Sequence, residues 1–396
     1  MRRIQFSSPA QCSALHALHL IMMFVLFSLC TQVLQAQNFT DEYLERHKAS
    51  LLADVESGRI LYAHRIDENI YPASLVKMMV ALITMENLKE GRISLRDPVR
   101  VSSWASRIGG RQVYLKQGEV FPLSEMMKAM VITSANDVTV AIAEHQMGSV
   151  EIFIEKMNLR ARELGMKHTR FHSVHGLPPG RRQQYDRSTG RDLLTLAREL
   201  LKHPQYLEWS SIRLDSFRQG TFQLLNTNHI LIRKYKGMDG MKTGYHRRSG
   251  FNLVATAKRG QRRFVSIVLG ARNSRWRRKI TRSLRDHGFE HYLRVSLDVT
   301  IDTSPLSVEV ELGREPNLRL RPKHPLVILL SEKERLRVVN RFYLLDRIEA
   351  PVEQGTKVGE MEYRLDGQPL GFVPLVAENG VEKAGMLSLL ANAIFN

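Results

Sequence analysis

The sequence predicts an α+β fold in which an antiparallel sheet covered by helices is followed by a small all-β domain. A β-hairpin pattern begins at Ser50 and ends at His64, and helical apolar spacing then dominates residues 75–201. Three apolar, strand-like runs follow between residues 241 and 271. Because strands at both ends enclose the helices, we expect them to join in one sheet.

The elements of this first domain follow from periodicity and turn residues. The hairpin has its turn at 56–58, and the first helix begins beside Pro72 and Ser74, which are ordinary helix-start residues. Helices are predicted at 75–88, 123–131, 138–146, 150–164, 190–201 and 274–292, and strands at 241–247, 251–258 and 264–271. These elements define a predicted domain over residues 40–293.

The remainder of the chain is predicted to be β-rich. Short runs at 306–312, 326–330, 335–339 and 370–376 indicate an all-β domain over residues 294–383. Pro374 predicts that the last of these is an edge strand, since proline cannot donate to a ladder. Residues 384–396 have apolar residues at helical spacing, so this tail either lies on a membrane surface or packs against the β domain.

The N-terminal residues 1–36 have the pattern of a signal peptide. Arg2 and Arg3 precede an apolar stretch from 14 to 34, and the small Ala36 suits a cleavage site. A retained membrane anchor is the alternative, and both predict export. Both cysteines of the chain lie in this segment, so a processed chain has no disulfide, no cysteine nucleophile and no cysteine-ligated zinc. No metal or other cofactor is predicted.

The chain is strongly basic, with a formal charge of +18 that clusters at 259–263 and 272–285. Such a charge favours anionic lipid head groups or cell-wall polymers as partners of an exported protein. Nucleic acid is not expected, because Trp276 is the only aromatic residue among those arginines. For each cluster alone, a solvated helix face is the competing interpretation.

Ser74 and Lys77 are the first candidates for chemistry. Their spacing of three places the hydroxyl and the ammonium on one face of the predicted helix. A serine needs a base to become a nucleophile, and a lysine serves only if its surroundings lower its pKa. Alone the pair is weak evidence, since a helix-capping serine followed by a surface lysine is common.

Two further motifs strengthen the case. Ser-Ala-Asn at 134–136 falls at a break between predicted helices, and Lys-Thr-Gly at 242–244 falls on a predicted strand. The three motifs occur in this order and in these contexts in penicillin-binding proteins and class A β-lactamases.

The chain resembles one branch of those proteins more closely. The segments 72–77, 132–137, 174–177, 188–192 and 239–244 look like signatures of the D-alanyl-D-alanine carboxypeptidases, the low-molecular-mass penicillin-binding proteins. Residues 350–359 are similar to that family's β-rich stalk, which in relatives ends in an amphipathic membrane helix. The resemblance implies a β-lactamase/transpeptidase-like fold for the first domain.

The resemblance also implies a role for each motif residue. Ser74 would attack the carbonyl between two D-alanines, Lys77 would accept its proton, and Ser134 would relay a proton to the leaving group. The implied substrate-binding residues are Asn136 for the substrate amide, Lys242 and Thr243 for the terminal carboxylate, and Gly244 and Tyr245 beside them, with backbone N–H groups of Ser74 and Tyr245 as the oxyanion hole.

The implied partners are peptidoglycan stem peptides, with β-lactams as covalent inhibitors, in the periplasm and with attachment to the outer face of the cytoplasmic membrane. The middle motif has Ala135 where glycine is usual, and His246 stands where threonine is common. Residues 226–228 lack the arginine that some relatives use for a carboxylate, which leaves Arg247 or Arg248 as candidates. His175 is expected to be structural, because the lysine already supplies the base.

Three other functions remain open at this point. A β-lactamase would use the same Ser-Lys pair, but no Glu-x-x-x-Asn phrase occurs between Asn136 and Lys242 to supply a deacylating base. An endopeptidase that cuts cross-links is closer still. A catalytically inactive cell-wall-binding protein is the third, and the intact serine and lysines argue against it.

Overall fold

The structure is a computed structural model that describes residues 43–181, 183–297 and 306–385. Of these, the residues up to 258 and residues 263–285 form one compact unit, and residues 259–262, 286–297 and 306–385 form a second. The predicted signal peptide and residues 386–396 of the predicted tail lie outside the described residues. None of the described helices has the length and apolar character needed to cross a membrane.

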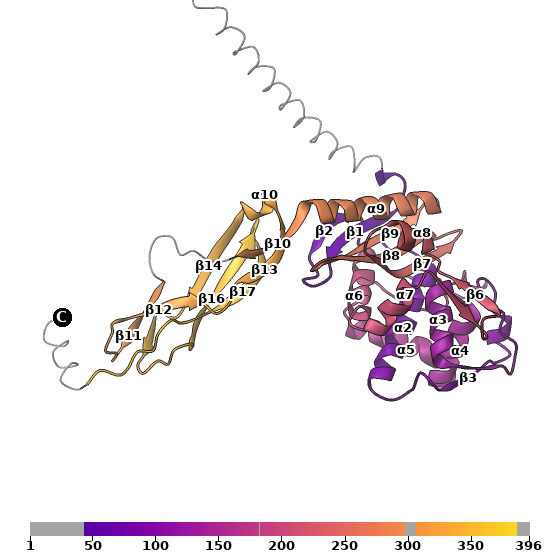
Figure 1. Cartoon of the computed structure of the whole chain (residues 1–396), viewed down its shortest axis with the longest axis horizontal. Helices are drawn as coiled ribbons and strands as arrows, with labels where there is room; N and C mark the ends of the chain where they lie inside the picture. The colour runs from indigo at the N-terminus through magenta and orange to yellow at the C-terminus, as the bar shows by residue number, and fades with distance from the viewer. Residues whose placement is uncertain (1–42, 182, 298–305, 386–396) are drawn as a thin grey trace, which may run out of the picture. The chain divides into compact units, whose positions relative to one another are not determined.

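The first unit contains a five-stranded sheet in the order β2-β1-β9-β8-β7 (Figure 1). Its strands are β1 (Ala49–Asp54), β2 (Ile60–His64), β7 (Met238–His246), β8 (Gly250–Arg259) and β9 (Arg262–Ala271). The β1–β2, β1–β9 and β7–β8 pairs are antiparallel, which confirms the predicted sheet. β7 forms one edge of this sheet and carries the Lys-Thr-Gly motif to it.

Helices cover the sheet on both faces (Figure 1). The predicted helices appear as α2 (Lys77–Lys89), α3 (Leu123–Thr133), α4 (Asn136–Met147), α5 (Val150–Glu163), α6 (Gly190–Leu200) and α9 (Ser274–His291). A 3-10 turn, η1 (Ala73–Val76), precedes α2. Sequence periodicity missed α7 (Pro204–Ser211), α8 (His229–Lys234) and the short strands β3 (Pro98–Arg100), β4 (Val120–Pro122), β5 (Leu214–Phe217) and β6 (Phe222–Leu225).

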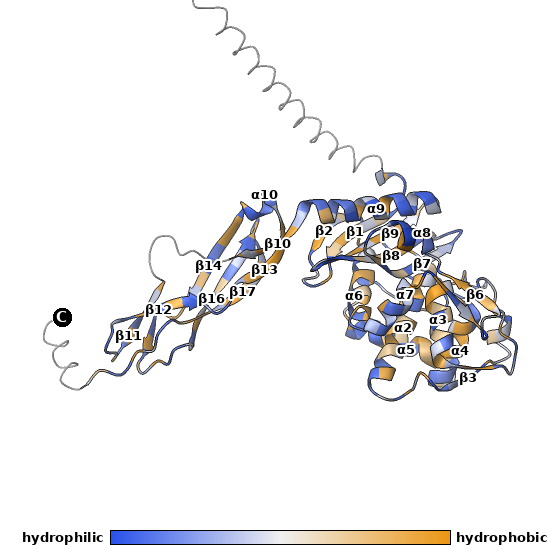
Figure 2. Cartoon of the chain, viewed as in Figure 1, coloured by the Kyte–Doolittle hydropathy of each residue, from blue (hydrophilic) through white to orange (hydrophobic). Residues whose placement is uncertain are grey.

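Helix α2 is the centre of the hydrophobic core. It is buried from Lys77 to Met85 and is apolar on all sides, as a helix surrounded by protein should be. Its neighbours α3 and α4 are also mostly buried, and Figure 2 shows apolar residues throughout this layer. Ser74 therefore stands at the start of a helix that is buried over most of its length.

The second unit is an all-β domain, as predicted. Its main sheet has the order β14-β16-β17-β12-β11-β15, and β10 (Tyr292–Leu297) pairs with β13 (Leu326–Ser331). The strands of the main sheet are β11 (Ser307–Glu311), β12 (Asn317–Pro322), β14 (Val338–Leu344), β15 (Arg347–Glu349), β16 (Lys357–Leu365) and β17 (Gln368–Ala377).

Two expectations for this unit were wrong. The strand predicted at 335–339 starts three residues later, as β14 at Val338, because Arg335 ends the short helix α10 (Glu332–Arg335), whose start is fixed by a capping box of Ser331 and Glu334. β17 is an internal strand despite Pro374. Pairing of β12 with β17 covers only Leu375–Ala377, and Pro374 contributes just its carbonyl, to the N–H of Lys323, so the missing donor costs nothing there.

Candidate active site

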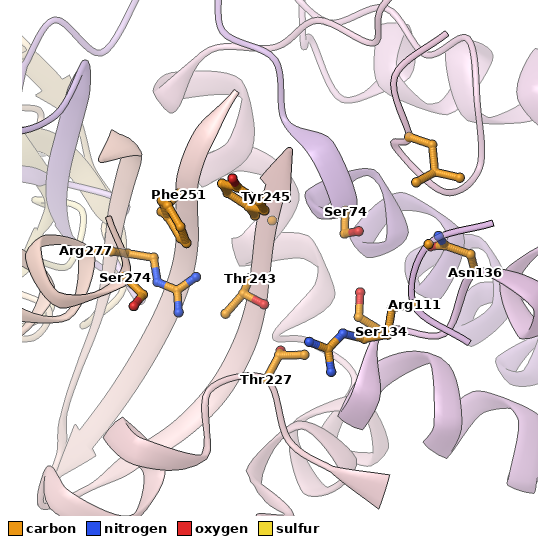
Figure 3. Close-up of a pocket in the computed structure, with 13 residues that line it drawn as sticks. Ser74, Arg111, Ser134, Asn136, Thr227, Thr243, Tyr245, Phe251, Ser274 and Arg277 are labelled. Carbon is orange, nitrogen blue, oxygen red and sulfur yellow. The ribbon is translucent and has the colours of Figure 1, made fainter. Parts of the chain in front are cut away.

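The three motifs meet in one pocket of about 380 Å³ in the first unit (Figure 3). Its wall combines residues from η1, the α3–α4 break, β7 and the start of α9. The lining residues are Ser74, Gly110, Arg111, Ser134, Asn136, Leu177, Thr227, Thr243, Gly244, Tyr245, Phe251, Ser274 and Arg277. Lys77 and Lys242 lie behind this surface, with 1% and 2% of their area exposed.

Ser74 is held in a tight backbone turn at the entrance to α2. Ala73, just before it, adopts φ +51, a left-handed conformation that is strained for alanine. A Cβ on Gly176 would lie 2.1 Å from the carbonyl oxygen of Ala73 and 2.8 Å from the N of Ser74. Only glycine allows this close approach, so the 174–177 segment fixes the serine from one side.

The Lys77 ammonium is fully engaged by hydrogen bonds. Nζ lies 3.1 Å from the Ser74 Oγ, 2.7 Å from the Asn136 Oδ1 and 2.9 Å from the His175 carbonyl oxygen. Burial lowers the pKa of Lys77 to about 7, against the opposing effect of the Asp186 and Asp137 carboxylates. A large fraction of this lysine is therefore neutral near neutral pH.

The helix break at 134–136 delivers two polar groups to the pocket. Ser134 ends α3 in the left-handed conformation, with φ +67, and α4 begins at Asn136. The Asn136 Nδ2 donates to the Gly109 carbonyl oxygen at 2.8 Å, while its Oδ1 accepts from Lys77. The amide that resemblance assigned to the substrate thus also ties Lys77 to the 109–111 loop.

β7 forms the opposite wall. Gly244 passes so close to the turn before Ser74 that a Cβ would lie 2.5 Å from the Pro72 carbonyl oxygen. Lys242 belongs to this strand and has a buried side chain, whose Nζ donates to the Thr243 carbonyl oxygen at 3.2 Å. Burial lowers its pKa well below the usual value, and the nearby cations Lys77, Arg111 and Arg277 lower it further.

Four cationic side chains therefore converge here, of which sequence reasoning missed Arg111 and Arg277. Arg277 is 7% exposed on α9, and burial, with a smaller contribution from Arg278, lowers its pKa to about 10. Among the described residues, no partner lies within hydrogen-bonding distance of its Nε. Thr227, Phe251 and Ser274, also missed, complete this end, and the Phe251 ring stacks 4.2 Å from that of Tyr245.

Several residues discussed from the sequence lie elsewhere. Arg247 and Arg248 are not among the residues that line the pocket, and Arg248 stacks on Tyr71 and Tyr185 with 5.3 and 5.1 Å to the ring centroids. The His246 Nδ1 accepts from the backbone N–H of Ser249. Neither Arg248 nor His246 lines the pocket.

His175 and Ala135 have structural positions too. The His175 Nδ1 accepts from the backbone N–H of Leu177, and burial lowers the pKa of the ring to about 4. The part of His175 that contacts the site is its backbone carbonyl oxygen, which accepts a hydrogen bond from the Lys77 Nζ. Ala135 is fully buried in the hydrophobic core and does not line the pocket.

This arrangement has the features of a serine hydrolase that uses lysine as its base. A hydroxyl lies beside an amine of lowered pKa, and a cationic wall faces it across a cavity large enough for a short peptide end. Fold and site together define a serine acyl-transfer enzyme.

The comparisons with known proteins identify the family. Residues 37–273 match the family model described as D-alanyl-D-alanine carboxypeptidase, and residues 300–383 match that of the penicillin-binding protein 5 C-terminal domain. The D-alanyl-D-alanine carboxypeptidase DacF of Bacillus subtilis is 34% identical over 363 residues, 89% of this chain and 90% of that protein. The chain therefore belongs to the D-alanyl-D-alanine carboxypeptidase family.

Solved structures agree with this assignment. Penicillin-binding protein 5 of Haemophilus influenzae superposes with a TM-score of 0.70 at 28% identity, over 85% of this chain and 98% of that one. Penicillin-binding protein D2 of Listeria monocytogenes in its ampicillin-bound form gives 0.56 at 31% identity, over 62% of this chain and 97% of that one. The second match covers about the length of the first unit alone.

Proposed function

We propose that this chain is a serine D-Ala-D-Ala carboxypeptidase that removes the terminal D-alanine from peptidoglycan stem peptides. The observation that carries the proposal is the grouping of Ser74 on the pocket wall with Lys77, of lowered pKa, and Lys242, both buried directly behind that wall. The names of the family and of the Bacillus subtilis relative support the substrate class.

Acylation begins with the neutral form of Lys77. A neutral amine has two N–H groups and one lone pair, and the Asn136 Oδ1 and the His175 carbonyl oxygen are placed to accept the two N–H groups. The lone pair is then left facing the Ser74 hydroxyl at 3.1 Å. Lys77 takes the hydroxyl proton as the Ser74 Oγ forms a bond to the substrate carbonyl carbon.

Collapse of the tetrahedral intermediate breaks the bond to the terminal D-alanine. Ser134, on the pocket wall, relays the proton from Lys77 to the departing amine, and backbone N–H groups of Ser74 and Tyr245 stabilise the oxyanion. Water then attacks the acyl-enzyme, with Lys77 again accepting the proton. This step frees Ser74 and the shortened stem peptide.

The cationic end of the pocket suits a substrate with a free carboxylate. Lys242 and Arg277 supply the charge, while Thr243 and Thr227 supply hydroxyls at the same end. A carboxylate placed between the two cations would satisfy donors that are otherwise buried with few partners. Recognition of a chain terminus favours carboxypeptidase activity over cleavage within a strand.

β-Lactams are proposed as covalent inhibitors that acylate Ser74. They carry a carboxylate, and the Listeria relative was solved with ampicillin. In the part of the chain that the structure describes, no Asp or Glu lines the pocket. A penicilloyl-enzyme therefore lacks the carboxylate base that class A β-lactamases use for hydrolysis, and it should persist.

The proposed place of action is outside the cytoplasm. The match to the family model begins at residue 37, directly after the predicted cleavage site at Ala36. Peptidoglycan lies outside the cytoplasm, which agrees with a signal peptide that directs export. Periplasmic location and peripheral attachment to the outer face of the cytoplasmic membrane follow as parts of this proposal.

The decisive test combines labelling with product release. The chain without residues 1–36 is incubated with a fluorescent penicillin, the labelled peptide is mapped by mass spectrometry, and D-alanine release from a D-Ala-D-Ala pentapeptide is measured. A stable label on Ser74 with released D-alanine is expected, and both disappear in Ser74→Ala. Rapid penicillin turnover would instead identify a β-lactamase, cleavage of cross-linked dimers alone an endopeptidase, and absence of label a binding protein.

A further inference from the structure

Helices α8 and α9 form a basic groove that the proposed reaction does not use. The groove has a volume of about 530 Å³ and lies within the first unit. It is lined by the cations Lys234, Arg275, Arg278, Lys279 and Arg282 and by the apolar or aromatic residues Ile230, Leu231 and Tyr235. None of these residues lines the catalytic pocket.

Three of the five cations in this groove, Lys234, Arg275 and Arg278, have no carboxylate partner among the described residues. Residues 229–236 and 271–285 contain no Asp or Glu, although they contain three and seven lysines or arginines. Such a concentration of like charge destabilises the folded chain slightly, and a polyanionic partner would compensate for it.

Helix α9 separates its cations by face. Arg277 and Arg285 are buried with Ile280 and Leu284, while Arg275, Lys279 and Arg282 are exposed. The buried face supports the sheet and the catalytic pocket, and the exposed face forms one wall of the groove.

The groove also has an apolar floor, which a purely electrostatic site would not need. Leu231 and Tyr235 are each 5% exposed, and Ile230 is half-buried between them and the solvent. The cations of the groove suit the phosphate of a phospholipid head group, and the apolar floor suits the adjoining glycerol region. A hydrophilic cell-wall polymer would use the cations but not the floor.

The N-terminal end of the described chain lies beside this groove. The Tyr43 ring packs edge-on against Trp276 of α9, with 6.1 Å between centroids, and Lys279 lies 5.1 Å from both ring centroids. The apolar segment at 14–34 precedes Tyr43 closely in sequence. In the proposed export this segment is held in the membrane until cleavage, which would bring Tyr43 and the adjoining face of α9 near the bilayer surface.

We propose that the α8–α9 groove is a docking site for anionic phospholipid head groups at the membrane surface. The groove holds the catalytic unit against the bilayer through Lys234, Arg275, Arg278 and Arg282, separately from any contact by the C-terminal tail. This inference does not depend on the proposed catalytic function, because it concerns a different face of the first unit.

The test compares two variants that lose the same number of positive charges. The groove variant carries Lys234→Gln, Arg275→Gln, Arg278→Gln and Arg282→Gln. The matched control carries Lys89→Gln, Arg162→Gln, Lys167→Gln and Arg170→Gln, four exposed cations on or beside the helices α2 and α5. Both are made in the chain without residues 1–36, and their melting temperatures and D-alanine release are recorded.

Binding is measured by co-sedimentation with vesicles of phosphatidylcholine, with and without phosphatidylglycerol. Residues 386–396 contain no cationic side chain, so they supply no attraction that is specific to the anionic vesicles. Each cation near an anionic surface contributes about 1 kcal/mol, or roughly fivefold in binding. We expect the groove variant to lose roughly 100-fold or more of its anionic-vesicle affinity.

The expected pattern is a loss in the groove variant alone, with D-alanine release unchanged and with wild-type binding weakened by salt. Equal losses in both variants would overturn the site, because the attraction would then come from net charge. Selective binding of soluble polyglycerol phosphate, with no preference for anionic vesicles, would overturn the lipid assignment in favour of a cell-wall polymer.

Discussion

The two ends of the catalytic pocket differ in how far their polar groups are already satisfied. At the serine end, the Lys77 Nζ has three hydrogen-bond partners and Asn136 uses both atoms of its amide. At the end formed by Lys242 and Arg277, the proposed carboxylate end, Lys242 donates to one carbonyl. Arg277 makes a single long bond of 3.5 Å to the Asn252 carbonyl oxygen, and among the described residues none pairs with its Nε. The polar groups of the first end are thus paired within the protein, while the second end retains cationic donors that the proposed substrate carboxylate would satisfy.

This difference has a physical rationale. Proton transfer needs its groups fixed in advance, because reorganisation during the reaction would raise the barrier. Binding of a carboxylate gains most when buried cationic donors lack other partners, since the ligand then supplies the missing interactions. Incompletely paired buried cations lower the folding stability of the free protein. The same cations would bind a carboxylate more strongly, which is a common trade-off between stability and activity.

Replacement of the catalytic lysine should have the largest effect. Lys77→Arg keeps the positive charge, but a guanidinium is not deprotonated in proteins and cannot accept the Ser74 proton. We expect acylation by a chromogenic cephalosporin to slow by roughly 10³-fold or more, measured by stopped flow. Thermal unfolding checks that the buried site tolerates the larger side chain.

If Lys77→Arg folds and acylates within about tenfold of the wild-type rate, another group must act as the base. The assignment of Lys77 as the base at the serine end of the pocket would then be wrong. Ser74→Ala serves as the reference for complete loss of acylation.

Removal of the incompletely paired Arg277 guanidinium should separate activity from stability. Arg277→Gln is expected to raise KM and lower kcat/KM roughly 10–100-fold, because a charge-assisted hydrogen bond contributes about 1.5–3 kcal/mol. The melting temperature should stay equal or rise, since a poorly paired buried charge is lost. Steady-state kinetics and calorimetry on the same preparation measure both.

Arg275→Gln is the matched control for this experiment. It lies two positions away on α9 and is exposed, so both KM and melting temperature should stay near wild type. A fall in stability for Arg277→Gln with an unchanged KM would show that Arg277 is structural and would remove the contrast between the two ends.

The pH dependence of acylation should report the serine end. Burial lowers the Lys77 pKa to about 7, and the neutral amine is the form that acts as base in the proposed mechanism. Acylation should therefore fall about tenfold for each pH unit below 7 and level off above it. Arg111→Gln removes a cation that lowers this pKa, so the midpoint should move upward; a downward shift would contradict the electrostatic account.

Sequence patterns predicted the two ends of the pocket unequally. Ser74, Lys77, Ser134, Asn136 and Lys242 stand in short motifs, and their contexts follow from local periodicity. Arg277 has no such motif, because it is one of seven cations in residues 271–285. Only the packing of α9 separates it from its exposed neighbours, and packing depends on contacts far apart in sequence.

The same limit explains the errors in the fold. Long helices and the central strands have enough turns or alternations to be recognised, whereas the six residues of α8 and the three of β3 do not. β17 was predicted as an edge strand because the rule for proline considers one strand alone. Its internal position depends on where β12 stops pairing, which no local pattern contains.

The smallest expected effect concerns Ala135 in the middle motif. Its side chain is fully buried in the core, its φ of −61° suits any residue, and it does not line the pocket. Ala135→Gly should therefore change kcat/KM for D-alanine release less than about threefold, while it lowers stability by about 1 kcal/mol through lost packing and greater freedom of the unfolded chain. Steady-state assays and denaturant unfolding provide the two numbers. A tenfold faster variant would mean that the methyl group constrains Ser134 and Asn136 through the backbone, and that the serine end is organised less favourably than its hydrogen bonds indicate.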